Sequence, residues 1–195
     1  LDHKYLDKEL NKNPHYIVIA VSSKGIKWVC DKLIKNYKKK YSIILLTKGL
    51  SVFKGNIITI SQEINYFFNK SKLPKQIITS IKGPCLAAGL INKIRTSTVI
   101  ANENITIAKK ISKLISTNYY KVEISRDING VEALGAIKNI YAMLIGASWG
   151  LSGKNIKSKI RDKYYHNTSS SLFSEAILEM KKFSIKMKGL PNTVY

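Results

Sequence analysis

The sequence predicts an α/β protein whose first part is a doubly wound parallel sheet and whose last part is the start of an all-helical domain. Two observations predict this class. As far as residue 124, short apolar runs rich in β-branched residues alternate with segments whose apolar residues recur at helical spacing. Beyond that point the sequence is helix-rich. We therefore expect two domains, residues 1–124 and residues 125–195.

Each element follows from its local pattern. The run YIVIAV at 16–21 is apolar throughout, as in a strand buried on both faces. Apolar residues between Ile26 and Ile34 recur at helical spacing, and SIILL at 42–46 predicts a second buried strand. Strand, helix and strand in this order form a βαβ unit with a right-handed crossover. The elements expected next are a helix over 60–68, strands at 76–81 and 96–101, a helix over 107–115, a strand at 120–124, a helix from about 130, a basic loop over 152–167 and a helix over 170–187.

The net charge indicates which kinds of binding partner the protein would attract. The chain has 33 Lys+Arg against 12 Asp+Glu, a formal net charge of +21, which would attract nucleic acid, an anionic membrane or a phosphorylated substrate. Almost all of the excess is lysine, spread along the chain, and arginine occurs only at Arg95, Arg126 and Arg161. Nucleic-acid recognition usually adds arginines and interleaved aromatics. We expect no nucleic-acid partner, although a non-catalytic basic α/β protein that binds nucleic acid stays an alternative.

Other classes are also disfavoured. No apolar run approaches the length needed to cross a bilayer, and no signal-peptide pattern is present, so we expect no membrane insertion and a cytoplasmic location. Cys30 and Cys85 lie in apolar surroundings without the spacing of a disulfide or metal framework. The histidines have no nucleophile or ligand at a recognisable spacing, which argues against a hydrolase and a metal site; they are His3, His15 and His166.

Two turns of the predicted sheet carry candidate ligand-binding residues. In an open parallel sheet, ligands gather at the carboxyl ends of the strands, and Lys48 with Gly49 lies just past such an end. A lysine there could clamp a phosphate, and one more surface lysine in a lysine-rich chain is the alternative. Gly83 and Pro84 follow the next strand in the same way. A glycine at such a turn can let a ligand approach the backbone closely or simply allow the turn.

Lys138 is the candidate catalytic residue. It is the only charged residue between Ala133 and Gly153. On a helix, Leu134, Tyr141 and Ile145 form one apolar stripe, and the lysine falls inside it, so we expect its side chain to point inward. Burial favours the neutral amine and lowers the pKa of a lysine, which makes it a useful proton carrier near neutral pH. The alternative is a lysine whose stem packs while its amine reaches water.

These positions resemble the NAD(P)-dependent glycerol-3-phosphate dehydrogenase family, in order and over nearly the whole chain. Residues 127–139, DINGVEALGAIKN, are similar to the family's D-x-x-G-V-E and G-A-L-K-N motifs, with Ile137 in place of leucine. IAVSS at 19–23 resembles the strand end V-P-S, TKGL around Lys48 resembles K-G, and GPCLA at 83–87 resembles G-P-S-F-A.

The resemblance implies a partial Rossmann-like fold, an NAD(H) or NADP(H) cofactor, and reduction of dihydroxyacetone phosphate to sn-glycerol 3-phosphate for phospholipid synthesis. It implies that Lys138 is the proton donor and acceptor and that Lys48 touches both cofactor and substrate. The other residues that it implicates are Gly83, Cys85 and Asn139 at the substrate and Ser23 and Ala87 at the cofactor. A homodimer is also implied.

Several positions depart from the family's pattern. Cys85 replaces a hydroxyl residue, Gly89 stands where glutamate is common, and Glu175 stands where arginine is frequent. The family's Gly-rich phosphate-binding turn has no counterpart, since no GxGxxG occurs in the sequence. We therefore expect an incomplete copy of a longer enzyme, truncated at both ends and inactive as it stands. Another β-hydroxyacid-type dehydrogenase of the same plan stays an alternative.

Overall fold

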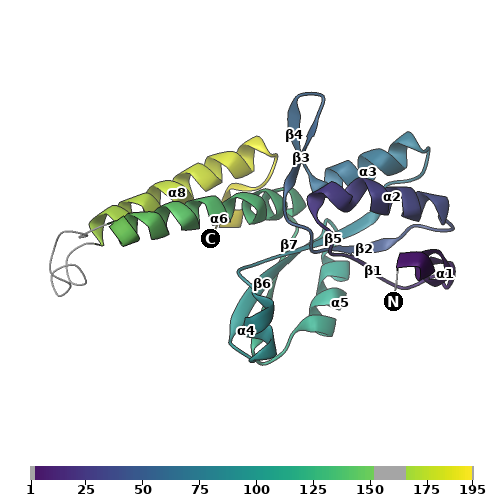
Figure 1. Cartoon of the computed structure of the whole chain (residues 1–195), viewed down its shortest axis with the longest axis horizontal. Helices are drawn as coiled ribbons and strands as arrows, with labels where there is room; N and C mark the ends of the chain where they lie inside the picture. Colours follow the sequence, from purple (N-terminus) through teal and green to yellow (C-terminus); the bar gives the residue numbers. More distant parts are fainter. Residues whose placement is uncertain (1–2, 152–165, 195) are drawn as a thin grey trace.

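The computed structural model describes residues 3–151 and 166–194, so most of the loop expected at 152–167 lies outside the described residues. The chain forms a five-stranded sheet covered by helices, from which a long helical hairpin projects (Figure 1). The elements in chain order are η1 (His3–Tyr5), α1 (Leu6–Asn11), β1 (Ile17–Ile19), η2 (Ser23–Gly25), α2 (Ile26–Lys35), β2 (Ser42–Leu45), β3 (Leu50–Phe53), β4 (Asn56–Thr59), α3 (Ile60–Lys70), β5 (Ile77–Lys82), α4 (Ala87–Ile91), β6 (Thr96–Ala101), α5 (Ile105–Ile115), β7 (Tyr120–Ser125), α6 (Ile128–Leu151), α8 (Asn167–Lys186) and η3 (Pro191–Val194).

The sheet has the strand order β1-β2-β5-β6-β7. β1, β2 and β5 run parallel to one another, and β7 runs parallel to β6. The predicted class, a Rossmann-like sheet followed by helices, is confirmed with one difference: β6 is antiparallel to β5, with Ser80 opposite Ala101. The short segment that contains α4 returns the chain directly along the neighbouring strand, so this connection forms no crossover of the βαβ kind.

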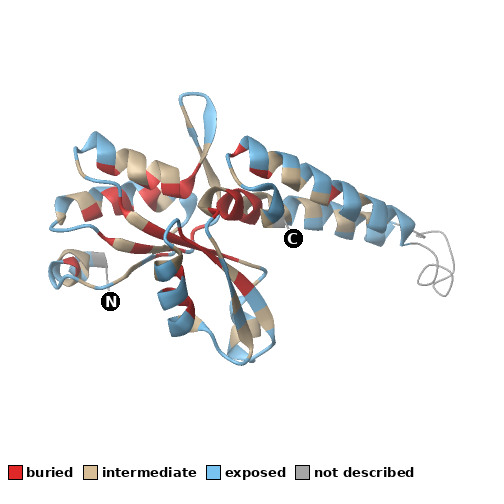
Figure 2. Cartoon of the chain, turned by 180° about the vertical axis from the view of Figure 1, so that it is seen from behind, coloured by how far each residue is buried: buried red, intermediate tan, exposed pale blue. Residues whose placement is uncertain are grey.

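Apolar side chains bury both faces of the sheet. Ile43 and Leu45 of β2 pack with α2 and α3, where Phe68 is fully buried. Ile44 points to the opposite face, toward the cluster that includes Ile111 of α5. This alternation is the period of a strand covered on both sides. Figure 2 shows that burial is concentrated in the sheet, in the helices against it and in the first turns of α6.

Local signals explain the elements around β2 and α3. Thr59 and Gln62 form a capping box: the Thr59 hydroxyl accepts from the Gln62 backbone N–H, and the Gln62 side chain accepts from the Thr59 N–H. The β3–β4 hairpin before it was not predicted. Its turn residues Lys54 and Gly55 both have positive φ, of 48° and 76°, as a two-residue type I′ turn requires. Lysine is an unusual residue for that turn, so the sequence carries only a weak hairpin signal.

The two long helices form a hairpin beside the sheet. α6 and α8 pack along each other and project from the α/β layer in both views (Figures 1 and 2). The Asp127 carboxylate joins the start of α6 to the segment after α8. It accepts from the Gly130 N–H at 2.8 Å, from the Leu190 N–H at 2.6 Å and from the Thr193 hydroxyl. The start of α6 is thereby tied to the segment that follows α8.

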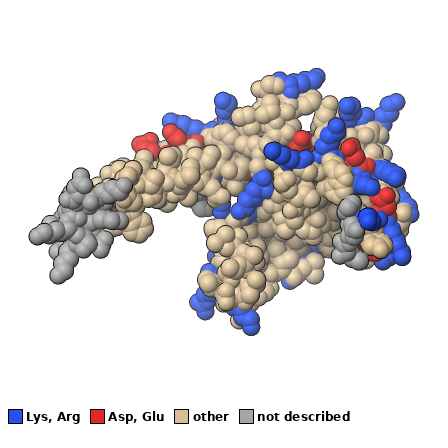
Figure 3. Space-filling model, viewed as in Figure 1, with Lys and Arg blue, Asp and Glu red and all other residues tan. Residues whose placement is uncertain are grey.

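One face of the molecule is drawn in Figure 3. On this face, lysines and arginines are scattered over the α/β layer without a single dominant cluster, and the projecting hairpin carries few of them. Within the described ranges, no helix combines the length and the apolar character that a membrane span needs.

Candidate active site at the carboxyl edge of the sheet

Three parallel strands bring predicted site residues to one edge of the sheet. Ser23 follows β1, Lys48 follows β2 and Gly83 follows β5. Because β1, β2 and β5 are parallel neighbours, their carboxyl ends meet at the same edge. This edge is where ligands bind in open α/β sheets.

The ends of β1 and β2 are tied together. The Thr47 hydroxyl donates to the Val21 carbonyl at 2.7 Å. Gly49 has φ +136°, and a Cβ at this position would lie 3.3 Å from the Ser23 Cβ. The turn that follows Lys48 therefore packs against Ser23, and only glycine combines this backbone conformation with this close approach. Ser23 and Lys48 are consequently held on neighbouring turns, and both are exposed.

α6 brings Lys138 toward this edge. On its apolar stripe, Leu134 is buried, whereas Lys138, Tyr141 and Ile145 are half-buried. Burial and the positive charge of Lys48 lower the pKa of Lys138. Lys48 is thus close enough to act electrostatically on Lys138, across the boundary between the sheet and the helical hairpin. A lysine ammonium with a lowered pKa gives up its proton more readily.

A third lysine at this site is buried and was missed by sequence reasoning. Lys82 ends β5 with 5% of its surface exposed, and its Nζ donates to the Leu45 carbonyl at 3.1 Å. Burial lowers the pKa of Lys82 to about 8, an effect that Glu132 opposes and Lys48 reinforces. The signal was present in the sequence: a charged residue directly after an apolar strand and directly before Gly83.

Glu132 of α6 is the buried counter-charge. It is 1% exposed, and its Oε2 accepts from the Ser61 backbone N–H at 3.1 Å. Its Oε1 has no hydrogen-bond partner. Burial raises the pKa of this carboxyl, and the charge of Lys82 opposes the rise. Glu132 lies within the motif DINGVEALGAIKN, yet the sequence alone does not indicate that it faces a lysine from the sheet.

The remaining predicted site residues are not in contact with Lys48 or Lys138 through any hydrogen bond in the part of the chain that the structure describes. A Cβ on Gly83 would lie 2.9 Å from the Ser97 carbonyl oxygen and 2.8 Å from the Thr98 hydroxyl, so this glycine is required by the approach of β6. Cys85 is half-buried and Ala87 exposed, both near the start of α4. Asn139 is exposed on α6. Among the described residues, no hydrogen bond joins these last three to Lys48 or Lys138.

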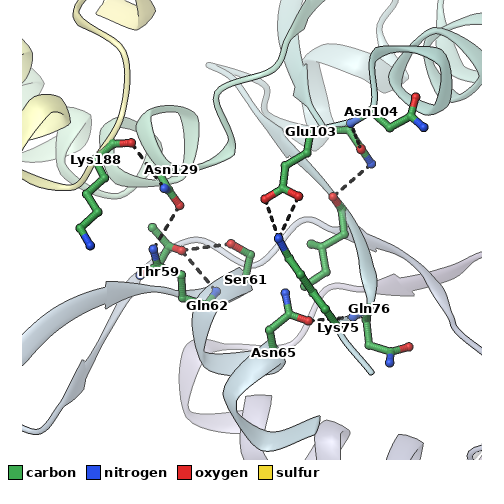
Figure 4. Close-up of polar contacts among 12 residues, drawn as sticks. Thr59, Ser61, Gln62, Asn65, Lys75, Gln76, Glu103, Asn104, Asn129 and Lys188 are labelled. Carbon is green, nitrogen blue, oxygen red and sulfur yellow. Dashed lines mark hydrogen bonds and ion pairs between the residues drawn. The ribbon is translucent and has the colours of Figure 1, made fainter. Parts of the chain in front are cut away.

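A polar hollow of about 760 Å³ lies at the opposite edge, near the amino end of β5 and the start of α6. None of the predicted site residues lines it. Figure 4 shows its polar groups pairing with one another: Lys75 with Glu103 at 2.7 Å, Asn65 with the Gln76 N–H, and Gln62 with Asn129. The contacts of Asn65 and Gln62 join α3 to the segment just before β5 and to the start of α6. The hollow is therefore distinct from the edge that carries the lysines.

Comparison with known proteins identifies similar sequences over most of the chain. A family model for the N-terminus of NAD-dependent glycerol-3-phosphate dehydrogenase matches residues 6–108, and the model for the C-terminus matches residues 127–195. Glycerol-3-phosphate dehydrogenase (NAD(P)+) from Clostridium tetani is 32% identical over 92% of this chain and 46% of its own length. The Clostridium botulinum enzyme (strain Eklund 17B) is 27% identical over 96% of this chain and 51% of its own length.

Two solved structures that resemble this chain carry the same enzyme name as its sequence relatives. The glycerol-3-phosphate dehydrogenase of Coxiella burnetii superposes with a TM-score of 0.72 at 25% identity, over 97% of this chain and 52% of that protein. The enzyme from Saccharomyces cerevisiae has a TM-score of 0.77 at 17% identity, with the same coverage, which shows the shared fold. The chain spans about half the length of the curated relatives it matches.

Proposed function

Because this chain belongs to the NAD-dependent glycerol-3-phosphate dehydrogenase family, we propose that its protein interconverts dihydroxyacetone phosphate and sn-glycerol 3-phosphate for phospholipid synthesis, with NAD(H) or NADP(H). The observation that carries the proposal is that Lys48, which follows β2 at the carboxyl edge, acts electrostatically on the half-buried Lys138 of α6 and helps to lower its pKa. In this proposal, residues 1–124 form the cofactor domain and residues 125–195 begin the substrate domain.

The residues at this edge fit the reactive end of a nicotinamide cofactor. The close packing of Gly49 on Ser23 holds the two turns together, and the Ser23 and Lys48 side chains on them are exposed. Ser23, Lys48 and Ala87 would hold the cofactor here. When bound, the cofactor supplies a hydride to the central carbon of the substrate, or takes one from it. The residues that would cradle its pyrophosphate in a Gly-rich turn are not among those of this sequence.

Lys138 supplies the proton in the proposed reaction. Its ammonium hydrogen-bonds the substrate carbonyl oxygen and stabilises the negative charge that develops there. It then transfers a proton to that oxygen, becomes a neutral amine and regains a proton from solvent. The lowered pKa favours this transfer, because burial and the charge of Lys48 both destabilise the ammonium. In the reverse direction, the neutral amine takes the hydroxyl proton.

Lys48 orients the substrate in this scheme. Its exposed amine is available to the phosphate group, and its position at the end of β2 keeps it beside the cofactor turn. Gly83, Cys85 and Asn139 would line the rest of the substrate. The formal net charge of +21 favours encounter with a phosphorylated substrate.

The protein is further proposed to be a cytoplasmic homodimer. Exposed apolar side chains on the projecting hairpin support a protein contact there, among them Met143, Trp149 and Phe173. Size-exclusion chromatography with light scattering tests the oligomeric state.

The function is tested on protein produced from the complete reading frame, by following NADH and NADPH oxidation with dihydroxyacetone phosphate. Lys138→Met keeps the packed stem and removes the proton, so we expect kcat to fall by about 10²–10⁴-fold. Lys121→Met is the matched control, because Lys121 lies on β7 and pairs with Glu123 in solvent. No turnover by the wild-type protein with either cofactor would sink the proposal, and so would full activity of Lys138→Met.

A further inference from the structure

Lys82 contacts both elements that carry the site lysines. Its Nζ donates to the Leu45 carbonyl, three residues before Lys48 on the same chain segment. Its Cβ, Cγ and Cδ lie 3.0–3.1 Å from where a Cβ on Gly135 would be, and Gly135 is three residues before Lys138. α6 therefore rests directly on the stem of Lys82, while the head of the same side chain holds the end of β2.

The contact depends on the absence of a side chain on α6. Gly135 is buried in a helix interior, where glycine is less favourable than alanine. A Cβ on residue 135 would lie closer to the Lys82 stem than Cβ atoms usually lie to their neighbours. Glycine therefore lets α6 approach this stem closely. The Lys82 side chain therefore lies between the end of β2 and α6 and contacts both.

Stability does not explain a charged residue at this point. Replacing buried charged groups by apolar side chains of similar volume is often neutral or stabilising. Lys82 and Glu132 are both buried, and Glu132 Oε1 is left without a hydrogen-bond partner. A methionine would fill the space of the Lys82 stem but could not hold the Leu45 carbonyl.

We propose that Lys82 is a positioning residue that fixes Lys48 relative to Lys138, with Glu132 as the counter-charge that keeps it in place. The inference rests on the proposed function. Lys82 acts through its two contacts: the hydrogen bond orders the turn of Lys48, and the packed stem sets the depth at which α6 presents Lys138. Loss of the hydrogen bond lets the two amines separate, which lowers turnover because small misplacements of reacting groups slow reactions strongly.

The test compares four forms of the protein from the complete reading frame: wild type, Lys82→Met, Glu132→Gln and the double variant. Glu132→Gln keeps the acceptor for the Ser61 N–H but leaves Lys82 without a counter-charge, so its melting temperature should fall. The double variant should regain that temperature. A positioning role predicts that both forms carrying Lys82→Met have kcat reduced by about 10–100-fold with a smaller change in KM. Activity that recovers together with the melting temperature in the double variant would show a merely structural role and overturn the proposal.

A second measurement does not depend on turnover. Lysine amines labelled with ¹³C-methyl groups are titrated by NMR, and the Lys138 signal is assigned from its loss in Lys138→Met. In Lys82→Met the Lys138 signal should titrate at higher pH than in the wild type, because Lys48 has moved away from it. Lys121→Met should leave the curve unchanged. If the wild type lacks turnover but the Lys138 curve shifts as expected, the dehydrogenase proposal fails while the role of Lys82 stands. An unshifted curve overturns the role of Lys82.

Discussion

The sheet-packed part of the molecule and the projecting part of the helical hairpin use apolar side chains in opposite ways. Around the sheet, Phe68 is 0% exposed, and it packs edge to face with Tyr37 and Tyr41. Along the outer part of α6, Met143 is 68% and Trp149 is 55% exposed. The two regions have similar side chains, so apolar character alone does not decide burial. What differs is whether a second layer covers them.

α6 itself contains both situations. Its residues from Gly130 to Gly135 are all buried against the sheet and α8, and those beyond Asn139 are mostly exposed. Lys138 lies at the boundary, half-buried, where a side chain can contact both the protein and a ligand. The residue that we propose as the proton donor therefore lies at the point where α6 leaves the core. Stability experiments can separate the two halves.

The largest contrast is expected between two phenylalanines. Phe68→Ala removes a fully buried ring and should lower the free energy of unfolding by about 4 kcal/mol. Phe173→Ala removes a ring of α8 that is 57% exposed, and should change it by no more than about 0.5 kcal/mol. Urea denaturation followed by circular dichroism measures both. A loss above about 2 kcal/mol for Phe173→Ala would mean that the hairpin is covered in solution, which also bears on the proposed dimer.

Two glycines of α6 give the next contrast. A Cβ on Gly130 would lie 2.1 Å from the Asp127 carboxylate, so Gly130→Ala should lower the free energy of unfolding by about 2–3 kcal/mol. Gly146 has no atom within 4 Å of the same position, so Gly146→Ala should raise it by about 0.5–1 kcal/mol through helix propensity. Thermal denaturation of the wild type and the two variants measures both changes. Equal changes in the two would refute the division of α6 into a packed and an open half.

The sequence predicts the class of fold and the edge of the site because both depend on local periodicity. Continuous apolar runs mark β1 and β2, and residues after buried parallel strands are expected at one edge. The antiparallel direction of β6 depends instead on how the short α4 segment returns the chain. The electrostatic effect of Glu132 on Lys82 likewise joins residues 50 positions apart in the sequence, and no periodicity records it. The β3–β4 hairpin was missed because Lys54 adopts a conformation that lysine rarely takes.

The smallest expected contrast is a pH dependence of the free energy of unfolding, which originates at Lys82, where α6 meets the sheet. The pKa of Lys82 falls from its ordinary value of 10.5 to about 8 on folding. Between these values the unfolded chain binds more protons than the folded protein, so the free energy of unfolding increases as the pH rises. For Lys82 alone, the increase from about pH 7.5 to about pH 9.5 amounts to about 1–2 kcal/mol.

Lys82→Met removes this contribution. The higher pKa expected for Lys138 in this variant reduces the variant's gain in stability with pH, so it changes the difference between the two proteins in the same direction. The groups that act on Lys82 are Glu132 from α6 and Lys48 from the end of β2. The difference between wild type and Lys82→Met, measured by urea denaturation across this range, should therefore rise with pH in favour of the wild type. Lys121→Met, which alters an exposed lysine, should show a flat difference. A flat difference for Lys82→Met as well would mean that Lys82 reaches water when it is charged. Its amine would then have left the Leu45 carbonyl, and the Lys82 side chain would no longer contact both the end of β2 and α6.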